Sequence, residues 1–538
     1  MSVAVDIVSQ PYPGIGFLSD HLLPQLIFGL LPAAGTEGDA HPLCRKFPTQ
    51  SNQRRKQQIS LIHLPAKYGF GRSKCRPIPR TAQCFGRNSN CCNLAGGCTT
   101  YGKRIRMRTS ALLLLIALNA QAQFKNVRIT LPGEGKISVV EPAVVINPAN
   151  PSNVVAAAGK DRVIFSRDGG EIWLETSVKS SAGVIGDMVL TADAKGNIYL
   201  AHLADATGEG KTAPGWLDRI VIQKSIDGGA LWNDGYFTGL NPPKDNDKPW
   251  LVSHPKKDLL ALTWTQFDQY GSKEAACQSN ILFSRSANKS EKWSDPVRIN
   301  KLSGDCQDGD LTAMGAMPFL DNEGRIFVTW AHNGIIYLDR SFDNGETWLR
   351  SDMAVARQMG GWDFQVPGLS RCNGLPYLVG DNSTSPFRGS LYLMFTDQRF
   401  GENDTDIWFT KSPNRGDNWS DPIRVNADAP GHHQFMPSMT VDPATGIIYI
   451  VFYDRRQYPA GDVQTDVYLA WSEDGGNHFS ETRISETPFA PSPLSFFGDY
   501  TAVSAYQGKV FPVWTRMDNG QTSIWTTVIS HQQLKNGK

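Results

Sequence analysis

The amino-acid sequence predicts an all-β protein folded as a β-propeller, in which small four-stranded sheets repeat around a ring. Three observations support this fold class. A turn motif of eight residues recurs at intervals of about sixty residues, a second pattern typical of a β-strand recurs between its copies, and four short strands fit into each interval.

The turn motif is Ser-x-Asp-Gly-Gly-x-x-Trp, and residues 166–173 and 225–232 match it in full. Four further copies diverge at one or more positions. The serines of successive copies are 59, 61, 55, 71 and 60 residues apart, and this regularity indicates a repeat architecture. The divergent copies are residues 286–293, 341–348, 412–419 and 472–479.

The residues of the motif predict a tight turn between two strands. An Asp or Asn side chain can bond the backbone N–H two residues further on, and Gly adopts positive φ without a clash of Cβ. The aromatic residue that ends each copy supplies a large apolar group, which we expect to pack against its own sheet. We therefore expect these turns to be structural and to take no part in chemistry.

This repeated turn resembles the Asp box, or bacterial neuraminidase repeat, of sialidase-like β-propellers. Six copies span residues 166–479, so the resemblance covers most of the repeated region. It implies a propeller of Asp-box blades. It does not by itself imply an activity, because one fold can serve several unrelated functions.

The second pattern, Gly-x-apolar-aromatic-apolar-x-aromatic, predicts one strand in most blades. We count seven units and favour seven blades; sialidases have six, and merging two units into a six-bladed ring would leave one blade oversized. The last unit lacks an outer strand, and Asn126–Thr130 resembles it, which would close the ring near both termini. The units begin at Glu141, Asp187, Asp247, Asp310, Phe364, Gln434 and Asp499.

The first 106 residues differ from the rest of the chain. They carry 14 Lys and Arg against 4 Asp and Glu, a balance of +10, whereas the remaining residues carry 39 against 48, a balance of −9. Residues 107–122 have a basic start, an apolar run and the cleavage pattern Ala120-Gln121-Ala122, which predict a secretory signal peptide. We interpret residues 1–106 as a misassigned or disordered leader before a start at Met107, and residues 123–538 as the propeller; a genuine targeting leader is the alternative.

The signal peptide predicts a secreted or periplasmic protein, and no other segment is apolar enough to form a stable membrane anchor. The acidic balance of the propeller argues against nucleic acid as a partner. Cys277 and Cys306 could form a disulfide after export, whereas the six cysteines of the leader lack the spacing of a zinc site. The sequence contains no glycine-rich phosphate loop, no HExxH and no GxSxG.

Polar residues gather where the predicted innermost strands begin, and innermost strands line the channel of a propeller. Asp187 and Asp247 are candidates for acid/base catalysis, and Glu141 for a carboxylate that assists a nucleophile. Trp250 is a candidate for substrate contact. Each acid could equally cap a strand or form an ion pair, and together the acids could hold a structural calcium ion. We expect no other metal or cofactor.

The resemblance to sialidases implies a specific nucleophile. Sialidases hold the substrate carboxylate with three arginines and use a tyrosine nucleophile assisted by a glutamate, with an aspartate as acid/base. Asp499-Tyr500-Thr501, followed by a glycine-led strand, resembles the segment that carries this tyrosine. Tyr500 is therefore the candidate nucleophile, and a buried structural tyrosine is the alternative.

Arg399, Arg455 and Arg516 match the arginine triad in number but not in place. They follow predicted second strands and could bind an anionic sugar, pair with the acids beside them, or brace neighbouring blades. The first arginine of the family lies in an Arg-Ile-Pro or Arg-Leu-Pro motif, and the matching place here is Val140-Glu141-Pro142. A carboxylate there would repel the carboxylate of sialic acid.

These residues support two alternative functions. The first is a secreted sialidase-like glycoside hydrolase that acts on terminal sugars of glycoconjugates, supported by the fold together with Tyr500 and the arginines. The second is a non-catalytic propeller that binds glycan or protein, supported by Glu141 in the place of an arginine. In both cases we expect a monomer, with a glycan or glycoconjugate as its main partner.

Overall fold

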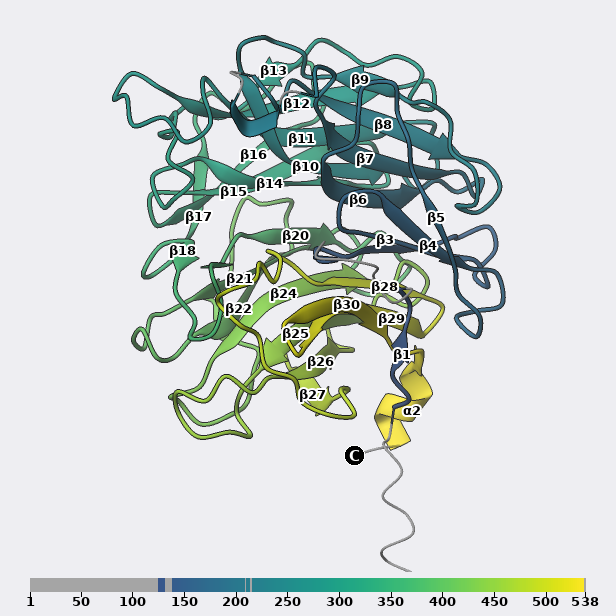
Figure 1. Ribbon diagram of the computed structural model, residues 1–538, viewed down its shortest axis with the longest axis vertical. Helices are drawn as coiled ribbons and strands as arrows, with labels where there is room; N and C mark the ends of the chain where they lie inside the picture. Colours follow the sequence, from purple (N-terminus) through teal and green to yellow (C-terminus); the bar gives the residue numbers. More distant parts are fainter. Residues whose placement is uncertain (1–123, 131–137, 209, 213–214, 537–538) are drawn as a thin grey trace, which may run out of the picture. The chain divides into compact units, whose positions relative to one another are not determined.

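The computed structural model shows a seven-bladed β-propeller (Figure 1). It describes residues 124–130, 138–208, 210–212 and 215–536, so the predicted leader and signal peptide lie outside the described residues. Seven antiparallel sheets follow one another along the chain, and the first six each hold four consecutive strands. The predicted all-β propeller and the favoured number of blades are confirmed.

Each sheet runs outward from its innermost strand. Blades 1 to 3 are β2 (Ala143–Ile146), β3 (Val154–Ala158), β4 (Arg162–Ser166) and β5 (Leu174–Ser177); β6 (Gly186–Ala192), β7 (Ile198–Ala204), β8 (Arg219–Ser225) and β9 (Tyr236–Thr238); and β10 (Asp245–Ser253), β11 (Leu260–Phe267), β12 (Ser279–Ser286) and β13 (Val297–Arg298).

The next three blades repeat this order. They are β14 (Met314–Leu320), β15 (Ile326–His332), β16 (Ile335–Ser341) and β17 (Met353–Arg357); β20 (Tyr377–Gly380), β21 (Leu391–Asp397), β22 (Asp406–Ser412) and β23 (Ile423–Arg424); and β24 (Gln434–Val441), β25 (Ile448–Asp454), β26 (Asp466–Ser472) and β27 (Ser480–Arg483).

Blade 7 combines strands from both ends of the chain. It is built from β28 (Ala502–Tyr506), β29 (Lys509–Asp518), β30 (Gln521–Thr526) and β1 (Val127–Arg128), and β31 (Ile529–Ser530) also pairs with β29. Within the described ranges, the elements outside the blades are the short 3-10 helix η1 (Gly210–Thr212), the hairpin of β18 (Asp363–Phe364) and β19 (Cys372–Asn373), and the helix α2 (His531–Asn536).

The ring is closed at the axis and at the rim. Successive innermost strands contact one another, and β28 contacts both β24 and β2. At the outer edge of blade 7, β1 pairs with β30, with Val127 opposite Thr526, which confirms the predicted role of Asn126–Thr130. The N-terminal strand thereby covers an edge that would otherwise be unpaired.

The hydrophobic core lies between the blades. One cluster joins Val155 and Ala157 of blade 1 to Leu200 of blade 2, and another joins Phe409 of blade 5 to Ile450 of blade 6. Strands β7 and β25 are buried at every residue, because both faces of a middle strand pack on neighbouring blades. Each blade therefore depends on its neighbours for its core.

The fifth blade begins later than expected. Its innermost strand β20 begins at Tyr377 rather than near Phe364, because the hairpin of β18 and β19 is inserted before it. The sequence around Phe364 is apolar enough to suggest a strand, and the strand that forms there belongs to this insertion.

The recurrent turns share one hydrogen-bond pattern. In the first, Ser166 Oγ donates to Asp168 Oδ1 (2.8 Å) and the Gly170 N–H donates to Ser166 Oγ (2.8 Å). The two bonds recur in the five other copies. Asp168 Oδ1 also accepts from the N–H groups of Glu171 and Ile172, three and four residues on, so the expected bond two residues on is wrong.

The aromatic residue of these turns packs against the preceding blade. The rings of Trp348 and Phe283 lie 5.0 Å apart, and those of Phe479 and Phe409 lie at the same distance. A Cβ on Gly345 would lie only 2.4 Å from the Phe283 ring, so the turn sits tightly on that ring. The turns fasten each blade to the one before it, which corrects the expectation that each plug packs on its own sheet.

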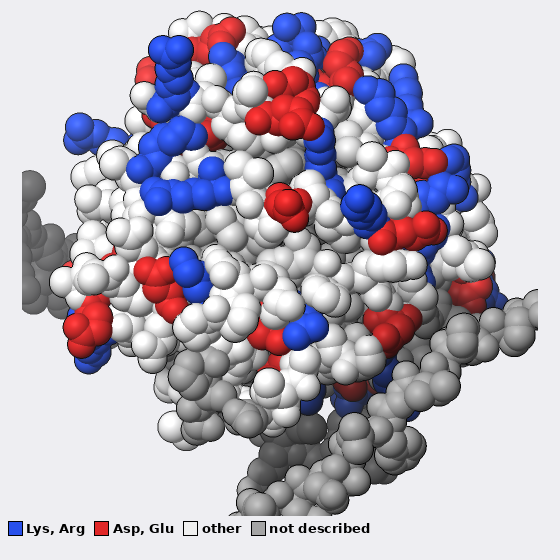
Figure 2. Space-filling model, turned by 90° about the horizontal axis from the view of Figure 1, so that it is seen from above, with Lys and Arg blue, Asp and Glu red and all other residues white. Residues whose placement is uncertain are grey.

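Charges on the outside of the propeller are mixed in sign. On the side shown in Figure 2, basic and acidic side chains lie interspersed. Some of these surface charges pair directly, as Lys195 does with Asp258 at 2.7 Å. This arrangement contrasts with the carboxyl-rich cluster at the channel described below.

Cys277 and Cys306 form the disulfide that the sequence suggested, with their Cα atoms 5.9 Å apart, and Cys372 is buried and free. In the part of the chain that the structure describes, no helix is long and apolar enough to cross a membrane.

We expect Gly345→Ala to destabilise the protein more than Gly389→Ala. Both glycines have positive φ (89° and 87°), so an alanine at either position costs about 1–2 kcal/mol in backbone strain. A Cβ at Gly389 meets no atom within 4 Å, whereas at Gly345 the clash with Phe283 adds roughly 1–3 kcal/mol. Urea unfolding followed by tryptophan fluorescence measures both losses, and equal losses would contradict the role assigned to the turn.

Candidate functional site

Several innermost strands begin with a residue in left-handed backbone conformation. Glu141, Asp187, Lys248 and Met436 have φ of 59°, 49°, 50° and 48°. In blade 4 the corresponding residue is Gly315, which also has a positive φ. The pairing between the innermost and the second strand shifts register beside Asp187, Lys248, Met436 and Gly315. This conformation is costly for residues other than glycine and is typical of functional sites. The resulting bulges bring side chains from different blades together near the axis.

Lys248 is at the centre of the charged cluster. Its Nζ lies 2.6 Å from Asp499 Oδ2, 3.8 Å from Asp187 Oδ2 and 3.9 Å from Glu141 Oε1. Burial alone would lower the pKa of Lys248, but the surrounding carboxylates outweigh burial and raise the pKa. The ammonium group therefore stays charged although only 9% of the side chain is exposed.

Arg371, in the loop between β18 and β19, extends this cluster. Its two terminal nitrogens lie 2.8 Å from Asp499 Oδ2 and 3.2 Å from Asp308 Oδ2. Tyr270 donates a hydrogen bond to Asp308 Oδ2 (2.7 Å), and Asn373 donates to the Asp499 carbonyl (2.9 Å). We did not predict Arg371 or Asp308 from the sequence, because neither lies at a position that recurs from blade to blade.

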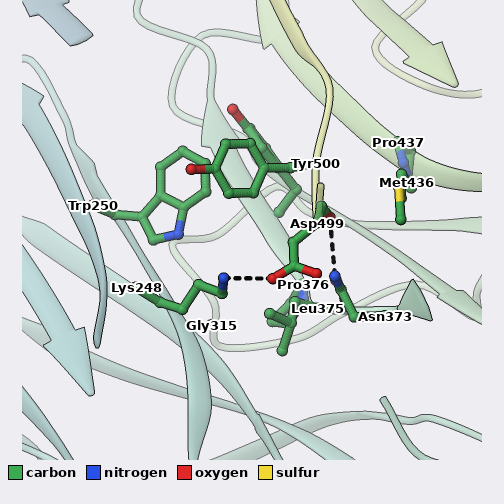
Figure 3. Close-up of a pocket in the computed structure, with 11 residues that line it drawn as sticks. Lys248, Trp250, Gly315, Asn373, Leu375, Pro376, Met436, Pro437, Asp499 and Tyr500 are labelled. Carbon is green, nitrogen blue, oxygen red and sulfur yellow. Dashed lines mark hydrogen bonds and ion pairs between the residues drawn. The ribbon is translucent and has the colours of Figure 1, made fainter. Parts of the chain in front are cut away.

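Three aromatic side chains form a wall beside the charged cluster. The Trp250 ring lies 5.5 Å from that of Tyr377 and 5.9 Å from that of Tyr500. All three line two adjoining cavities, of which one also contains Lys248 and Asp499 (Figure 3). The other is lined mainly by aliphatic side chains of β2, β6 and β28. The aromatic wall thus separates a charged mouth from an apolar part of the channel.

The carboxyl groups of the cluster differ in their affinity for protons. Burial raises the pKa of Glu141, and the charge of Asp187 raises it further. Burial also raises the pKa of Asp247, and the charge of Asp187 raises it further. Burial would raise the pKa of Asp499 too, but two neighbouring cations outweigh it and lower the pKa. Carboxyl groups whose pKa values are pushed apart are candidates for acid and base roles.

Tyr500 lies against Asp187, with its hydroxyl 3.4 Å from Asp187 Oδ1. Burial, followed by the charges of Asp187 and Glu141, raises the pKa of the phenol, so it keeps its proton unless a neighbour accepts it. From the sequence we expected Glu141 to assist this tyrosine. In the structure Asp187 makes the contact, and Glu141 takes part in no hydrogen bond among the described residues.

Arg399, Arg455 and Arg516 are not part of this cluster. Arg399 binds Asp397 (2.7 Å) and stacks on a tryptophan ring, while Arg516 binds Asp518 (2.7 Å). Arg455 is buried and donates to a carbonyl of the loop that carries Arg371, at 2.6 Å. The contacts of Arg399 and Arg516 match the alternative of pairing with the acids beside them, and that of Arg455 matches the bracing alternative. They give no support to the predicted role of the three arginines in binding a substrate carboxylate.

The acids of the mouth use cations of the chain as their counter-ions. Lys248 and Arg371 occupy the positions between them, and among the residues that the structure describes no three Asp, Glu, His or Cys side chains are arranged to hold a metal ion. The predicted calcium alternative therefore has no preformed set of ligands in this part of the chain.

No protein-family model and no curated protein matches the chain. Several solved structures are similar to it. A protein of unknown function from Dyadobacter fermentans is 12% identical, with 76% of this chain and 98% of that one covered and a TM-score of 0.43. The Hadza microbial sialidase Hz136 is 12% identical, with 71% and 73% covered and a TM-score of 0.41. An α-L-arabinofuranosidase from Fusarium graminearum is 16% identical, with 68% and 99% covered and a TM-score of 0.42.

We expect Lys248→Met to lower the free energy of unfolding by about 3 kcal/mol at pH 7, because it leaves Asp499 and its neighbours as buried charges without their ammonium partner. Asp499 has a lower pKa in the folded protein than in the unfolded chain. Its ion pair with Lys248 therefore stabilises the wild-type protein fully at any pH above the pKa that Asp499 has in the unfolded chain, and this stabilisation is lost as the pH falls through its pKa in the folded protein. The difference between variant and wild type should therefore shrink in acid.

Urea unfolding at neutral and acidic pH measures this difference. Lys195→Met is the matched control, because Lys195 is 59% exposed in its pair with Asp258 and its loss should change stability by less than about 1 kcal/mol. Equal effects of the two substitutions would show that Lys248 does not hold the cluster together.

Proposed function

We propose that the channel mouth is the active site of a secreted glycoside hydrolase that acts on terminal sugars of glycoconjugates. The observation that carries this proposal is the contact of Tyr500 with Asp187, whose charge, after burial, helps to raise the pKa of Asp247. A hydroxyl, a carboxylate and a carboxyl group that retains its proton lie together. These groups suffice for acid/base cleavage of a glycosidic bond.

Asp187 is the acid/base residue in this proposal. It is more exposed than Asp247, because Asp187 is partly accessible whereas Asp247 is buried. Asp247 holds its proton more tightly than an ordinary carboxyl group, because burial raises its pKa. Asp187 exchanges protons with the substrate, and Asp247 supplies protons to Asp187.

Tyr500 is the nucleophile. Its oxygen forms a bond to the anomeric carbon as the glycosidic C–O bond breaks, and the Asp187 pair passes the phenol proton to the leaving oxygen. Water then cleaves the sugar from Tyr500 and restores the phenol. Transfer of the proton to Asp187 is essential, because burial and the nearby charges raise the pKa of Tyr500.

The aromatic wall supports action on terminal sugars. Trp250 presents an aromatic face on which a sugar ring can stack, and Tyr377 and Tyr500 pack beside it. All three side chains line the cavity that contains Lys248 and Asp499, so a terminal sugar bound there would contact aromatic rings. Secretion is supported by the predicted signal peptide and by the Cys277–Cys306 disulfide.

A non-catalytic propeller that binds glycan or protein is the second candidate. The raised pKa of Tyr500 favours it, because a phenol that keeps its proton is a hydrogen-bond donor and a poor nucleophile. The same aromatic wall and carboxyl groups would then serve recognition alone.

A panel of nitrophenyl glycosides that includes a sialoside tests the hydrolase. We expect turnover of at least one substrate, with kcat/KM lowered at least about 100-fold in both Tyr500→Phe and Asp187→Asn, since each removes a group that moves the proton. Tyr236→Phe, on the exposed outer strand β9, should keep wild-type activity. Absence of turnover across the panel would reject the hydrolase and favour the binding propeller.

The pH dependence provides a separate test. Because burial raises the pKa of Asp247 above its ordinary value of 3.8, the pair keeps its proton into a higher pH range than an isolated carboxyl group. Above that pKa, kcat/KM should fall about tenfold per pH unit as the proton is lost. Asp247→Asn should have low activity without this alkaline fall. A wild-type profile that starts to fall near the ordinary carboxyl pKa would contradict the assignment.

A further inference from the structure

We propose that the channel mouth recognises a sugar bearing a protonated amino group, with the Glu141 carboxylate as the partner of that ammonium group. We take the ligand to be a sugar because of the function proposed above, on which this inference rests. The substrate class that follows is an amino sugar with a free amine, and it excludes acidic sugars.

Carboxyl groups outnumber cations around the mouth, and both cations are already engaged. Lys248 contacts three carboxylates, and Arg371 binds Asp499 and Asp308 through its two terminal nitrogens. Both cations thus already have carboxylates of the chain as their counter-ions. An anionic sugar would therefore meet an excess of negative charge, whereas a cation would reduce it. The five carboxyl groups are Glu141, Asp187, Asp247, Asp308 and Asp499.

Two of these carboxyl groups have hydrogen-bonding capacity that the chain does not use. Glu141 has 12% of its side chain exposed and, within the described ranges, makes no hydrogen bond; Lys248 at 3.9 Å is too distant for one. Asp499 is 98% buried by its side chain and lines the cavity beside Lys248 and Tyr500, and its Oδ1 has no hydrogen-bond partner among the residues that the structure describes. Buried carboxylate oxygens normally accept hydrogen bonds, so donors are expected from a ligand.

An ammonium group fits this need better than a neutral or acidic group. It has three N–H donors and no acceptor, and it carries the charge that the mouth lacks. A metal ion is a weaker fit, because the described residues include no three carboxyl, His or Cys groups placed to ligate one. Glu141 is the carboxyl group of the mouth best placed for this contact, since it is accessible and free of hydrogen bonds.

Binding of a cation at Glu141 is coupled to the loss of a proton. The charged groups that face Glu141 are Asp187 on β6, Lys248 on β10, Arg371 in the hairpin loop and Asp499 before β28. Burial and the two carboxylates raise the pKa of Glu141, and they outweigh Lys248 and Arg371, which lower it. An ammonium group beside Glu141 favours the ionised form. The affinity for the amino sugar should therefore increase as the pH rises through the pKa of Glu141, until the amine of the sugar loses its own proton.

Three methyl glycosides that share one ring and differ in charge test the proposal. They are a 2-amino-2-deoxyglycoside, its 2-acetamido analogue and the corresponding uronide, each in the gluco and galacto series. With the full chain, calorimetric titration at neutral pH and low salt should show the amino sugar binding at least about tenfold more tightly than the acetamido sugar, with the uronide weakest. Equal affinities for the amino and acetamido sugars, or tighter binding of the uronide than of the amino sugar, would overturn the proposal.

Glu141→Gln isolates the charge, because glutamine has nearly the same shape. We expect its affinity for the amino sugar to fall at least about tenfold and its affinity for the acetamido sugar to stay unchanged. Glu171→Gln, in an exposed turn, removes the same charge elsewhere and should change neither affinity. An equal loss of affinity for the amino and the acetamido sugar in Glu141→Gln would overturn the proposal, since it would show that Glu141 shapes the site without selecting the charge of the ligand.

These outcomes separate the inference from the proposed hydrolase. Preferential binding of the amino sugar without turnover of any amino glycoside would support charge recognition and reject hydrolysis. Turnover of neutral glycosides without a preference for the amino sugar would support hydrolysis and overturn charge recognition.

Discussion

The buried ammonium group of Lys248 is the interaction on which the channel mouth depends. Carboxyl groups of three other strand entries, at Glu141, Asp187 and Asp499, lie within 3.9 Å of it. Without a cation their mutual repulsion in a poorly solvated site would oppose the approach of the innermost strands. A single lysine, supported by Arg371 on the far side of Asp499, lets these strand entries converge on the axis.

Closure of the ring imposes this convergence. Each blade packs on the next through clusters shared between sheets, the recurrent turns fasten each blade to the one before it, and β1 completes blade 7. Seven innermost strands must therefore meet around one axis. Left-handed residues and bulges at their entries turn Glu141, Asp187 and Lys248 inward, which places the strain of the fold at the site with the most chemistry.

The mouth differs in charge from the sialidase pattern that the turns resemble. Glu141 stands where that pattern has its first arginine, and Arg399, Arg455 and Arg516 are engaged elsewhere. What the mouth does contain is a pair of interacting carboxyl groups, a tyrosine against one of them and a wall of aromatic rings. This arrangement is suited to moving a proton and to attracting a cation, and it is poorly suited to holding a carboxylate.

The sequence by itself determined the repeat, and with it the fold class, the seven blades and the closing strand at Asn126–Thr130, because six of the seven blades carry the same turn and most share one strand pattern. Residues at recurring positions, such as Asp187, Asp247 and Tyr500, could be placed near the channel for the same reason. Only the tertiary structure decided which charges meet. Arg371 and Asp308 come from segments without a repeat, Asp187 rather than Glu141 contacts Tyr500, and the three predicted arginines turn to other partners. Pairing between distant side chains depends on the path of each loop, and a repeat period carries no information about that path.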